Sequence, residues 1–209
     1  MKFFVHRSPL VLKWWLSEYL WKVDTQERVI YLTFDDGPIP VVTEYVLKQL
    51  AAFSAKATFF CIGDNVRKHP QVFQELKSQG HSIGNHTFNH LNGWKTETDR
   101  YLENIKMCQD ILETETRLFR PPYGRMTRAQ FRSLPAGSRV VMWDVLTGDF
   151  SREIVPEKAT ATCIRHSGPG TIMLLHDSLK AEMNLRFMLP RVLAHFSEKG
   201  YRFEALPMQ

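Results

Sequence analysis

Apolar and polar positions follow two alternating patterns along this chain. Short runs of β-branched and aromatic residues, such as 29–34, predict strands that are buried on both faces. Longer stretches between them, such as 41–53, carry apolar residues at spacings of three and four, which predicts helices packed on a sheet. The predicted strands are 29–34, 57–61, 81–84, 117–119, 139–143, 171–175 and 201–203. The predicted helices are 10–21, 41–53, 70–79, 96–116, 128–133, 156–166 and 184–199.

The alternation of strands and helices predicts a parallel sheet covered by helices, either a barrel or an open doubly wound sheet. No glycine-rich phosphate-binding pattern follows any predicted strand, which weakens the nucleotide-binding version of such a sheet. Acidic, histidine or arginine side chains come directly after five of the strands, and a (β/α) barrel builds its active site at these carboxyl ends. The pattern therefore favours a barrel.

The composition is that of a globular protein with ample core. The chain has 209 residues, of which 44% are apolar, enough for one large domain. Its formal net charge of +5 is spread along the sequence, and no block of Lys or Arg indicates a nucleic-acid-binding surface. The cysteines Cys61, Cys108 and Cys163 are odd in number and far apart, so we expect reduced thiols rather than disulfides or a zinc knuckle.

The N-terminal stretch is rich in tryptophan. Residues 10–21 contain three tryptophans and follow Ser8 and Pro9, which are typical of a helix start. This helix is too short to span a bilayer, so we expect it to lie across the underside of the domain; the alternative is contact between residues 9–21 and a membrane surface. The first residues lack the apolar run of a secretory signal, and we expect a cytoplasmic protein, with membrane association as a second option.

Two adjacent carboxylates follow the first predicted strand. Asp35 and Asp36 come directly after the apolar run 29–34, and Gly37 and Pro38 then end the strand. Two acids at the end of a buried strand lose hydration and repel each other, unless a cation or a proton resolves the conflict. A solvated loop is the alternative. The buried strand favours a metal or catalytic site whose other members follow other strands.

Two histidines stand four residues apart after the third predicted strand. His86 and His90 would share one face of a helical turn and could hold one ion between them. Either histidine alone is readily explained as a structural residue. With an acid from the first strand they make a three-ligand site that leaves positions open for water and substrate. Zinc fits these ligands best, and cobalt, nickel or iron could substitute for it.

Five polar segments stand at or just after predicted strands. In chain order they are 33–37 (TFDDG), 86–90 (HTFNH), 120–124 (RPPYG), 143–149 (WDVLTGD) and 174–176 (LLH). With these segments the sequence resembles the polysaccharide deacetylase family, also called the NodB homology domain or carbohydrate esterase family four. The resemblance implies an α/β fold, a distorted (β/α)7 TIM-like barrel, formed by one catalytic domain (28–209) after an N-terminal extension (1–27). It also implies a metal-dependent hydrolase that removes N-acetyl groups from aminosugar polymers such as peptidoglycan, chitin or poly-N-acetylglucosamine.

The resemblance implies a role for each matching residue at the metal. Asp36, His86 and His90 would hold the divalent cation. Asp35 would act as general base on the attacking water, and Arg120 would pair with Asp35 to keep it ionised and aimed. Taken alone, Arg120 is equally well explained as a salt bridge at the rim.

The remaining matches imply contacts with the leaving amine and the sugar. His176 would protonate the amine with support from Asp149, although a helix-capping pair of His176 and Asp177 and a loop cap at Asp149 are the structural alternatives. The residues expected at the substrate are Tyr123, through its backbone N–H, Leu174 in the acetyl pocket, and Phe150 and Pro121.

The sequence departs from the family pattern at one position within the fourth segment and at the position directly after it. Leu146 stands where a further acid is frequent, and Phe150 replaces a tryptophan that flanks the substrate, so sugar specificity is open. We expect N-deacetylation of N-acetylglucosamine-type saccharides. The alternatives are an O-acetyl esterase or non-sugar amidase on the same scaffold, and a non-catalytic sugar-binding protein, which would have no need of Asp35.

Overall fold

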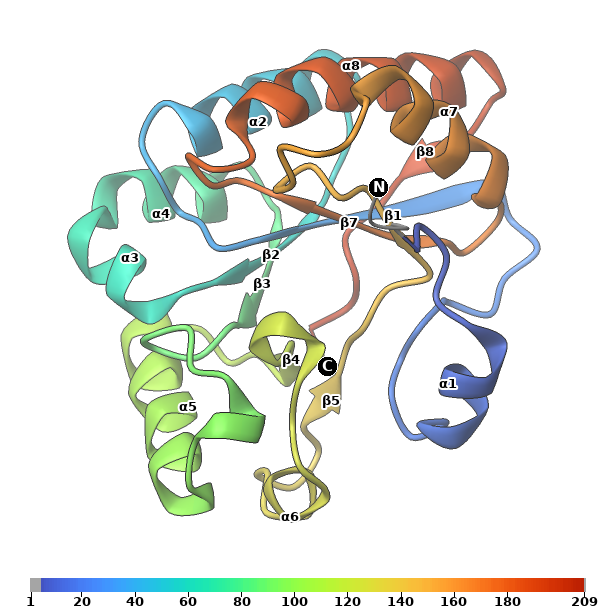
Figure 1. Cartoon of the computed structure of the whole chain (residues 1–209). Coiled ribbons are helices and arrows are strands. Elements are labelled where there is room, and N and C mark those ends of the chain that lie inside the picture. The colour runs from blue at the N-terminus through green and yellow to red at the C-terminus, as the bar shows by residue number, and fades with distance from the viewer. Residues whose placement is uncertain (1–4, 209) are drawn as a thin grey trace.

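Strand β1 (Val29–Asp35) is the central strand of the protein, and each of its 7 residues is buried. The computed structural model describes residues 5–208, so residues 1–4 of the predicted N-terminal extension and Gln209 lie outside the described residues. Figure 1 shows β1 crossing the middle of a curled sheet with helices around it. Leu32 packs into the main core, whereas Tyr31 packs into a smaller core on the opposite face, which explains why the run is nearly all apolar.

The sheet is parallel and follows the strand order β5-β4-β3-β2-β1-β7-β6, with β8 paired to the start of β1. Its two end strands, β5 and β6, form no ladder with each other in the described part of the chain, so the barrel has an open seam. The predicted distorted barrel is confirmed. The strands after β1 are β2 (Thr58–Cys61), β3 (Ser82–Asn85), β4 (Leu118–Phe119), β5 (Arg139–Val140), β6 (Val145–Leu146), β7 (Ile172–His176) and β8 (Arg202–Phe203).

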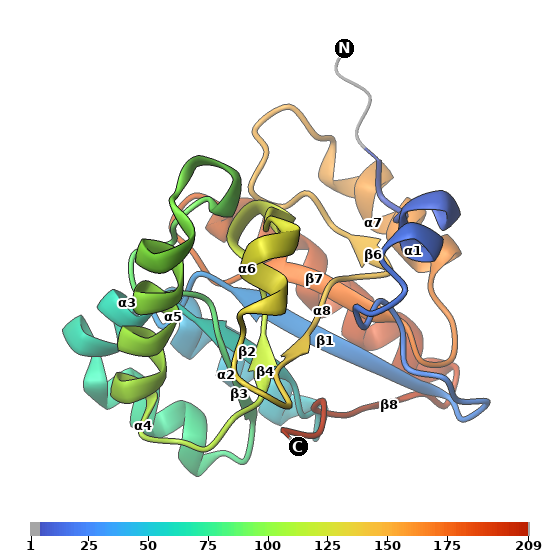
Figure 2. The ribbon, with the colours of Figure 1, turned by 90° about the horizontal axis from the view of Figure 1, so that it is seen from below.

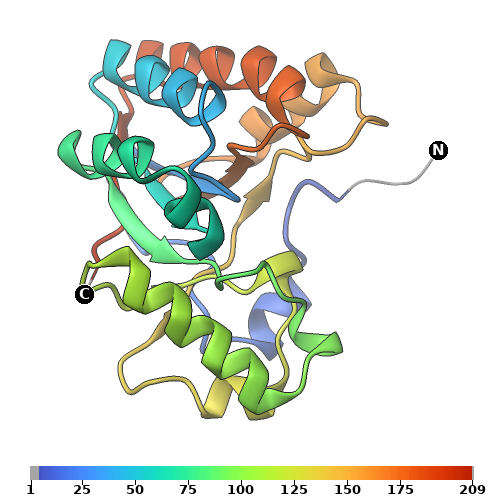
Figure 3. The ribbon, with the colours of Figure 1, turned by 90° about the vertical axis from the view of Figure 1, so that its left-hand side faces the viewer.

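Helices cover the outside of the curled sheet. Figure 3 shows α2 and α8 side by side above it, with α5 and α6 on the lower side. The helices are α1 (Leu10–Trp15), α2 (Val42–Ala52), α3 (Gly63–Lys68), α4 (Pro70–Ser78), α5 (Thr98–Leu112), α6 (Arg128–Arg132), α7 (Pro156–His166) and α8 (Glu182–Glu198), with short 3-10 turns η1 (Gly93–Lys95) and η2 (Pro122–Gly124).

The N-terminal segment closes the open seam. Isolated bridges join Arg7 to Val145 of β6 and Leu20 to Val141, just beyond β5. Figure 2 shows the blue segment running past β6. The predicted helix 10–21 is therefore too long: it ends at Trp15, because the residues after it are drawn into extended contacts with the sheet edge.

The predicted strand 139–143 is also too long. It breaks after Val140 and resumes as β6, because the carbonyls of Val141 and Met142 accept hydrogen bonds from the guanidinium of Arg120. Helix α5 begins at Thr98 rather than at 96, and it has no side-chain cap. The short helix α3 was not predicted. The three cysteines are free and buried, as expected.

Candidate active site

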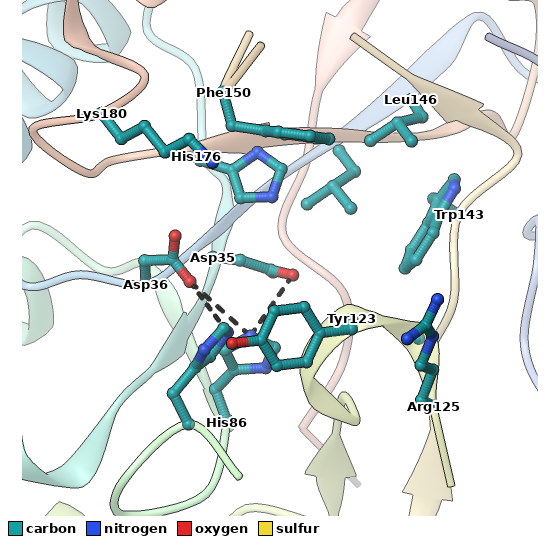
Figure 4. Close-up of a pocket in the computed structure, with 13 residues that line it drawn as sticks. Asp35, Asp36, His86, Tyr123, Arg125, Trp143, Leu146, Phe150, His176 and Lys180 are labelled. Atoms are coloured by element: carbon teal, nitrogen blue, oxygen red, sulfur yellow. Dashed lines mark ion pairs between the residues drawn. The ribbon is translucent and has the colours of Figure 1, made fainter. Parts of the chain in front are cut away.

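A cavity of about 520 Å³ opens at the carboxyl ends of the strands. Figure 4 shows His176 and Phe150 on one side of it, and Asp35, Asp36, His86 and Tyr123 on the other. Residues that were predicted from five separate segments of the sequence thus meet around one space. The lining residues are Asp35, Asp36, His86, His90, Tyr123, Gly124, Arg125, Trp143, Leu146, Phe150, Leu174, His176 and Lys180.

Asp35, the last residue of β1, is paired with a buried arginine. The Arg120 Nη1 lies 2.7 Å from Asp35 Oδ1 and donates a second bond to Thr33 Oγ1, at 2.8 Å. Arg120 is fully buried, and its guanidinium stacks on the Phe60 ring at 4.1 Å. Two backbone carbonyls accept hydrogen bonds from its Nε and Nη2, so the charge is fixed in one position. The Arg120 guanidinium therefore aims one carboxylate oxygen and offsets its charge in a site with little water.

Asp36 lies in a tight turn, and its carboxylate and that of Asp35 both approach His86 Nε2, at 3.9 and 3.7 Å. Its φ is 85°, in the left-handed region, and its carbonyl accepts a 2.7 Å bond from Asn65 Nδ2. The next residue, Gly37, donates its N–H to Asp177 Oδ1 at 3.0 Å. A Cβ on Gly37 would lie 1.9 Å from the Asp177 carboxylate, so glycine is required here. Asp177 supports the turn through this hydrogen bond. Burial raises the pKa of the Asp177 carboxyl to about 8.

His86 and His90 approach Asp36 from a loop after β3. The loop is not the helical turn that the spacing suggested: Thr87 and His90 have positive φ values of 61° and 56°. This tight, irregular backbone turns both rings to the same side, with their centroids 5.1 Å apart. His86 donates from Nδ1 to the carbonyl of Arg120 at 2.7 Å, which leaves the lone pair of Nε2 directed toward the carboxylates.

Asp36, His86 and His90 have the arrangement of a metal-binding group. One ligand atom from each lies within 4.8 Å of the others, and His90 Nε2 is 3.3 Å from Asp36 Oδ1. Burial lowers the pKa of both histidines, so they are neutral and can donate lone pairs. Two neutral imidazoles and a carboxylate fit a divalent cation, with positions left open on the cavity side.

His176, at the end of β7, forms an acid–base pair with Asp149 across the cavity. Asp149 accepts two bonds from His176, one from Nδ1 at 2.8 Å and one from the backbone N–H at 2.8 Å. Asn184 donates to the Asp149 carbonyl at 2.8 Å and anchors the loop. Burial disfavours the imidazolium, but the Asp149 carboxylate outweighs it and raises the pKa of His176 to about 9. His176 therefore carries a proton at neutral pH.

The predicted substrate contacts divide into those that line the cavity and one that does not. Tyr123 is 59% exposed, has a φ of 61° and packs its ring 4.6 Å from that of His90. Leu174 and Phe150 also line the cavity, and the Phe150 ring meets the His176 ring edge-on at 4.9 Å. Pro121 is buried outside the lining, where its carbonyl accepts the N–H of Gly124.

Sequence reasoning missed the residues whose contacts come from distant segments. Asp144, which directly follows the predicted strand 139–143, pairs with Lys13 of α1 and lies outside the lining. Arg125 and Lys180 line the cavity, yet neither belongs to a recognisable motif. Arg125 directly follows the 120–124 segment, and this position was the available signal for it. No local pattern indicated the pairing of Asp144 with Lys13.

Comparisons with known proteins agree with this geometry. The polysaccharide deacetylase family matches residues 22–134. A peptidoglycan-N-acetylglucosamine deacetylase of Bacillus cereus is 35% identical over 195 residues, 88% of this chain and 88% of that protein. A chitooligosaccharide deacetylase of Azorhizobium caulinodans is 35% identical over 207 residues, 89% of this chain and 96% of that protein. The crystal structure of the Bc1960 peptidoglycan N-acetylglucosamine deacetylase superposes with a TM-score of 0.87 at 29% identity and covers 96% of this chain and 95% of that one. The chain belongs to the polysaccharide deacetylase family.

Proposed function

We propose that this protein is a metal-dependent N-deacetylase that hydrolyses the acetamido groups of N-acetylglucosamine-containing saccharides. The observation that carries the proposal is the meeting of three groups in one cavity: the ligand set of Asp36, His86 and His90, the Asp35–Arg120 pair and the His176–Asp149 pair. A non-catalytic sugar-binding protein would have no need of a buried base opposite a protonated acid.

The ligand set favours zinc as the metal. Two imidazoles and one carboxylate suit its borderline softness, and cobalt, nickel or iron would also fit. When bound, such a cation lowers the pKa of a water molecule and polarises the acetamido carbonyl. His86 is oriented for this task by its bond to the Arg120 carbonyl, so the same residue that aims Asp35 also fixes one ligand.

Asp35 and His176 divide the proton transfers between them. Asp35 accepts a proton from the water as its oxygen attacks the carbonyl carbon, and the buried Arg120 balances the charge of the Asp35 carboxylate. His176 gives its proton to the departing amine nitrogen, so the C–N bond breaks with a neutral amine as leaving group. Acetate and the free aminosugar are the products.

Three further residues hold the acetamido group. By family resemblance, the backbone N–H of Tyr123 stabilises the oxyanion that develops on the carbonyl oxygen. Leu174, which is 2% exposed, closes the space where the acetyl methyl would lie. Phe150 covers one edge of the His176 ring and limits the access of water to it.

Acetate release from N-acetylglucosamine oligomers tests this function. The chelated protein is compared with protein to which one equivalent of zinc or cobalt has been returned. We expect release to depend on the metal and to rise with oligomer length as more of the cavity is filled. Metal binding without acetate release from any oligomer would reject the N-deacetylase and direct attention to O-acetyl esters and non-sugar amides.

We also propose that helix α1 contacts a membrane surface. Its side chains Leu10, Val11, Trp14 and Trp15 are 73%, 76%, 80% and 62% exposed, which is unusual for such large apolar groups. Among residues 5–208 there is no helix with the length and apolar character needed to cross a membrane. Binding to vesicles should be lost in a Trp14→Ala, Trp15→Ala double variant while acetate release persists; equal binding would reject the contact. A cytoplasmic location stays a prediction.

A further inference from the structure

Two cationic side chains line the cavity without an acidic partner. Arg125 and Lys180 both border it, and neither forms an ion pair within the part of the chain that the structure describes. The nearby acids are already engaged: Asp35, which lines the cavity, pairs with Arg120, and the buried Asp149 behind the lining pairs with His176. Asp36 belongs to the metal ligand set. The positive charges of Arg125 and Lys180 are therefore in excess and face the space where substrate would lie.

Arg125 is held in place by an aromatic side chain rather than by an acid. Its guanidinium lies 4.9 Å from the centre of the Trp94 ring, and the indole N–H of Trp94 donates to the Met126 carbonyl at 3.2 Å. No side-chain hydrogen bond of Arg125 to any residue in 5–208 accompanies this stacking. The guanidinium thus has a defined position and unused N–H donors, which is the condition for binding an incoming anion.

Lys180 repeats this arrangement on the opposite side of the site. Its ammonium lies 5.5 Å from the centre of the Phe150 ring, and Figure 4 shows it across the cavity from Arg125. A saccharide that places one acetamido group between Asp35 and His176 would extend toward both cations. A neutral chain of sugars would offer these cations only hydroxyl and acetamido oxygens, whereas a carboxylate would form stronger, charge-assisted hydrogen bonds with them.

We propose that Arg125, with Lys180 on the other side, selects N-acetylated glycans that carry carboxylates on the units beside the one being deacetylated. The inference rests on the proposed N-deacetylase function and names its substrate class: a glycan of the peptidoglycan type rather than a neutral chitooligosaccharide. The planar guanidinium can bind a carboxylate through two parallel N–H bonds, which gives Arg125 the larger share of the selection. The carboxylate can be that of a lactyl ether on the sugar or that of an attached peptide.

Matched tetrasaccharides test the proposal. One is a tetramer of N-acetylglucosamine, one alternates N-acetylglucosamine with N-acetylmuramic acid bearing free lactyl carboxylates, one has these carboxylates converted to methylamides, and one carries acidic stem peptides. We expect the wild type to prefer the carboxylated tetramers. In Arg125→Gln that preference, as a ratio of kcat/KM values, should fall about two- to fivefold, through KM rather than kcat. Lys180→Gln should produce a smaller fall. A preference that survives the methylamide but needs the peptides assigns the carboxylate to the peptide.

The control is Arg191→Gln. Arg191 also stacks on an aromatic ring, at 3.6 Å from Phe187, but it lies on α8 and outside the cavity lining. The Arg191→Gln variant should leave the preference for carboxylated tetramers intact.

Calorimetric binding of the carboxylated tetramer to metal-free protein supplies a second readout. This binding should weaken in Arg125→Gln and with added salt. Equal losses on neutral and carboxylated tetramers, or no loss, would overturn the selection by Arg125 while leaving the deacetylase in place. Acetate release from none of the tetramers would overturn the N-deacetylase itself and this inference with it.

Discussion

The inner wall of the cavity and its rim are built in opposite ways. His86 forms part of this wall, and Arg120 and Asp149 lie directly behind it. All three residues are 0–1% exposed and are held by hydrogen bonds to fixed partners. At the rim, the side chains of Arg125 and Lys180 are exposed and contact only an aromatic face within the described residues. The inner wall thus has one arrangement available, which suits proton transfer, whereas the rim keeps its donors available for a substrate. This contrast assigns the chemical step to the inner wall and the specificity for the saccharide to the rim.

The largest effect should follow from removing a residue of the proposed metal ligand set. His90→Gln is suited to this because the His90 side chain is 26% exposed, so the change disturbs the core little. Loss of only the hydrogen bond that supports a ligand typically lowers metal affinity by about 10–100-fold. Loss of the ligand itself should lower zinc affinity by more than this. Metal content after dialysis and acetate release measure this loss. His195→Gln, on α8, is the matched control; full zinc binding by His90→Gln would remove His90 from the ligand set.

The next largest effect should distinguish the leaving groups. His176→Ala should slow hydrolysis of an acetamide by about 10²–10⁴-fold, because an amine leaves poorly without a proton. An aryl acetate should be affected far less, since its leaving group needs no such help. Parallel assays on both substrates measure the ratio. Small and equal losses on both would contradict the role of His176 as general acid.

A change in pH dependence should expose the link between Asp149 and His176. In the wild type, Asp149 holds the pKa of His176 at about 9, so the imidazolium persists through neutral pH and is lost above that value. In Asp149→Asn the carboxylate charge is gone and burial dominates, so the pKa falls and the alkaline limb of kcat/KM should move to lower pH. Both proteins are measured with the same metal, because its charge also lowers the pKa of a nearby imidazolium. An unmoved alkaline limb would show that another group controls it.

The smallest effect should come from the rim. Phe150→Ala removes the ring that meets His176 edge-on at 4.9 Å, but it leaves the Asp149 pair intact. We expect kcat/KM to fall by about three- to tenfold, mainly through KM, because one aromatic contact is worth about 1 kcal/mol. Steady-state assays with oligomers measure it. A loss as large as that of His176→Ala would erase the distinction between the inner wall and the rim.

The same contrast explains what the sequence could predict. Asp35 and His176 are the last residues of two buried strands, so they were predictable from strand ends that a parallel barrel brings together. The local shape of the loops was not: the helical turn suggested for His86 and His90 is a loop with positive φ values. Contacts between distant segments were also invisible, such as the support of Gly37 by Asp177, since no local pattern encodes a pairing across the fold.

The predicted ends of helices and strands were wrong for a related reason. Helix α1 and strand β5 both end early, because hydrogen bonds to distant partners compete with the local pattern. The N-terminal segment follows the sheet edge instead of continuing its helix, and Arg120 takes the carbonyls that a longer β5 would have offered to a neighbouring strand. Local propensity describes a segment alone, and these segments are shaped by what they contact.

The central claim is that Asp35 is the base of a metal-dependent deacetylase, and one measurement on Asp35→Asn tests it most directly. Zinc content and acetate release from N-acetylglucosamine oligomers are determined on the same preparation, together with its thermal midpoint, because Arg120 loses its charged partner. We predict that the variant keeps one equivalent of zinc and remains folded at the assay temperature, while acetate release falls by at least about 10²-fold. Acetate release close to that of the wild type, from zinc-loaded and folded Asp35→Asn protein, would contradict the claim.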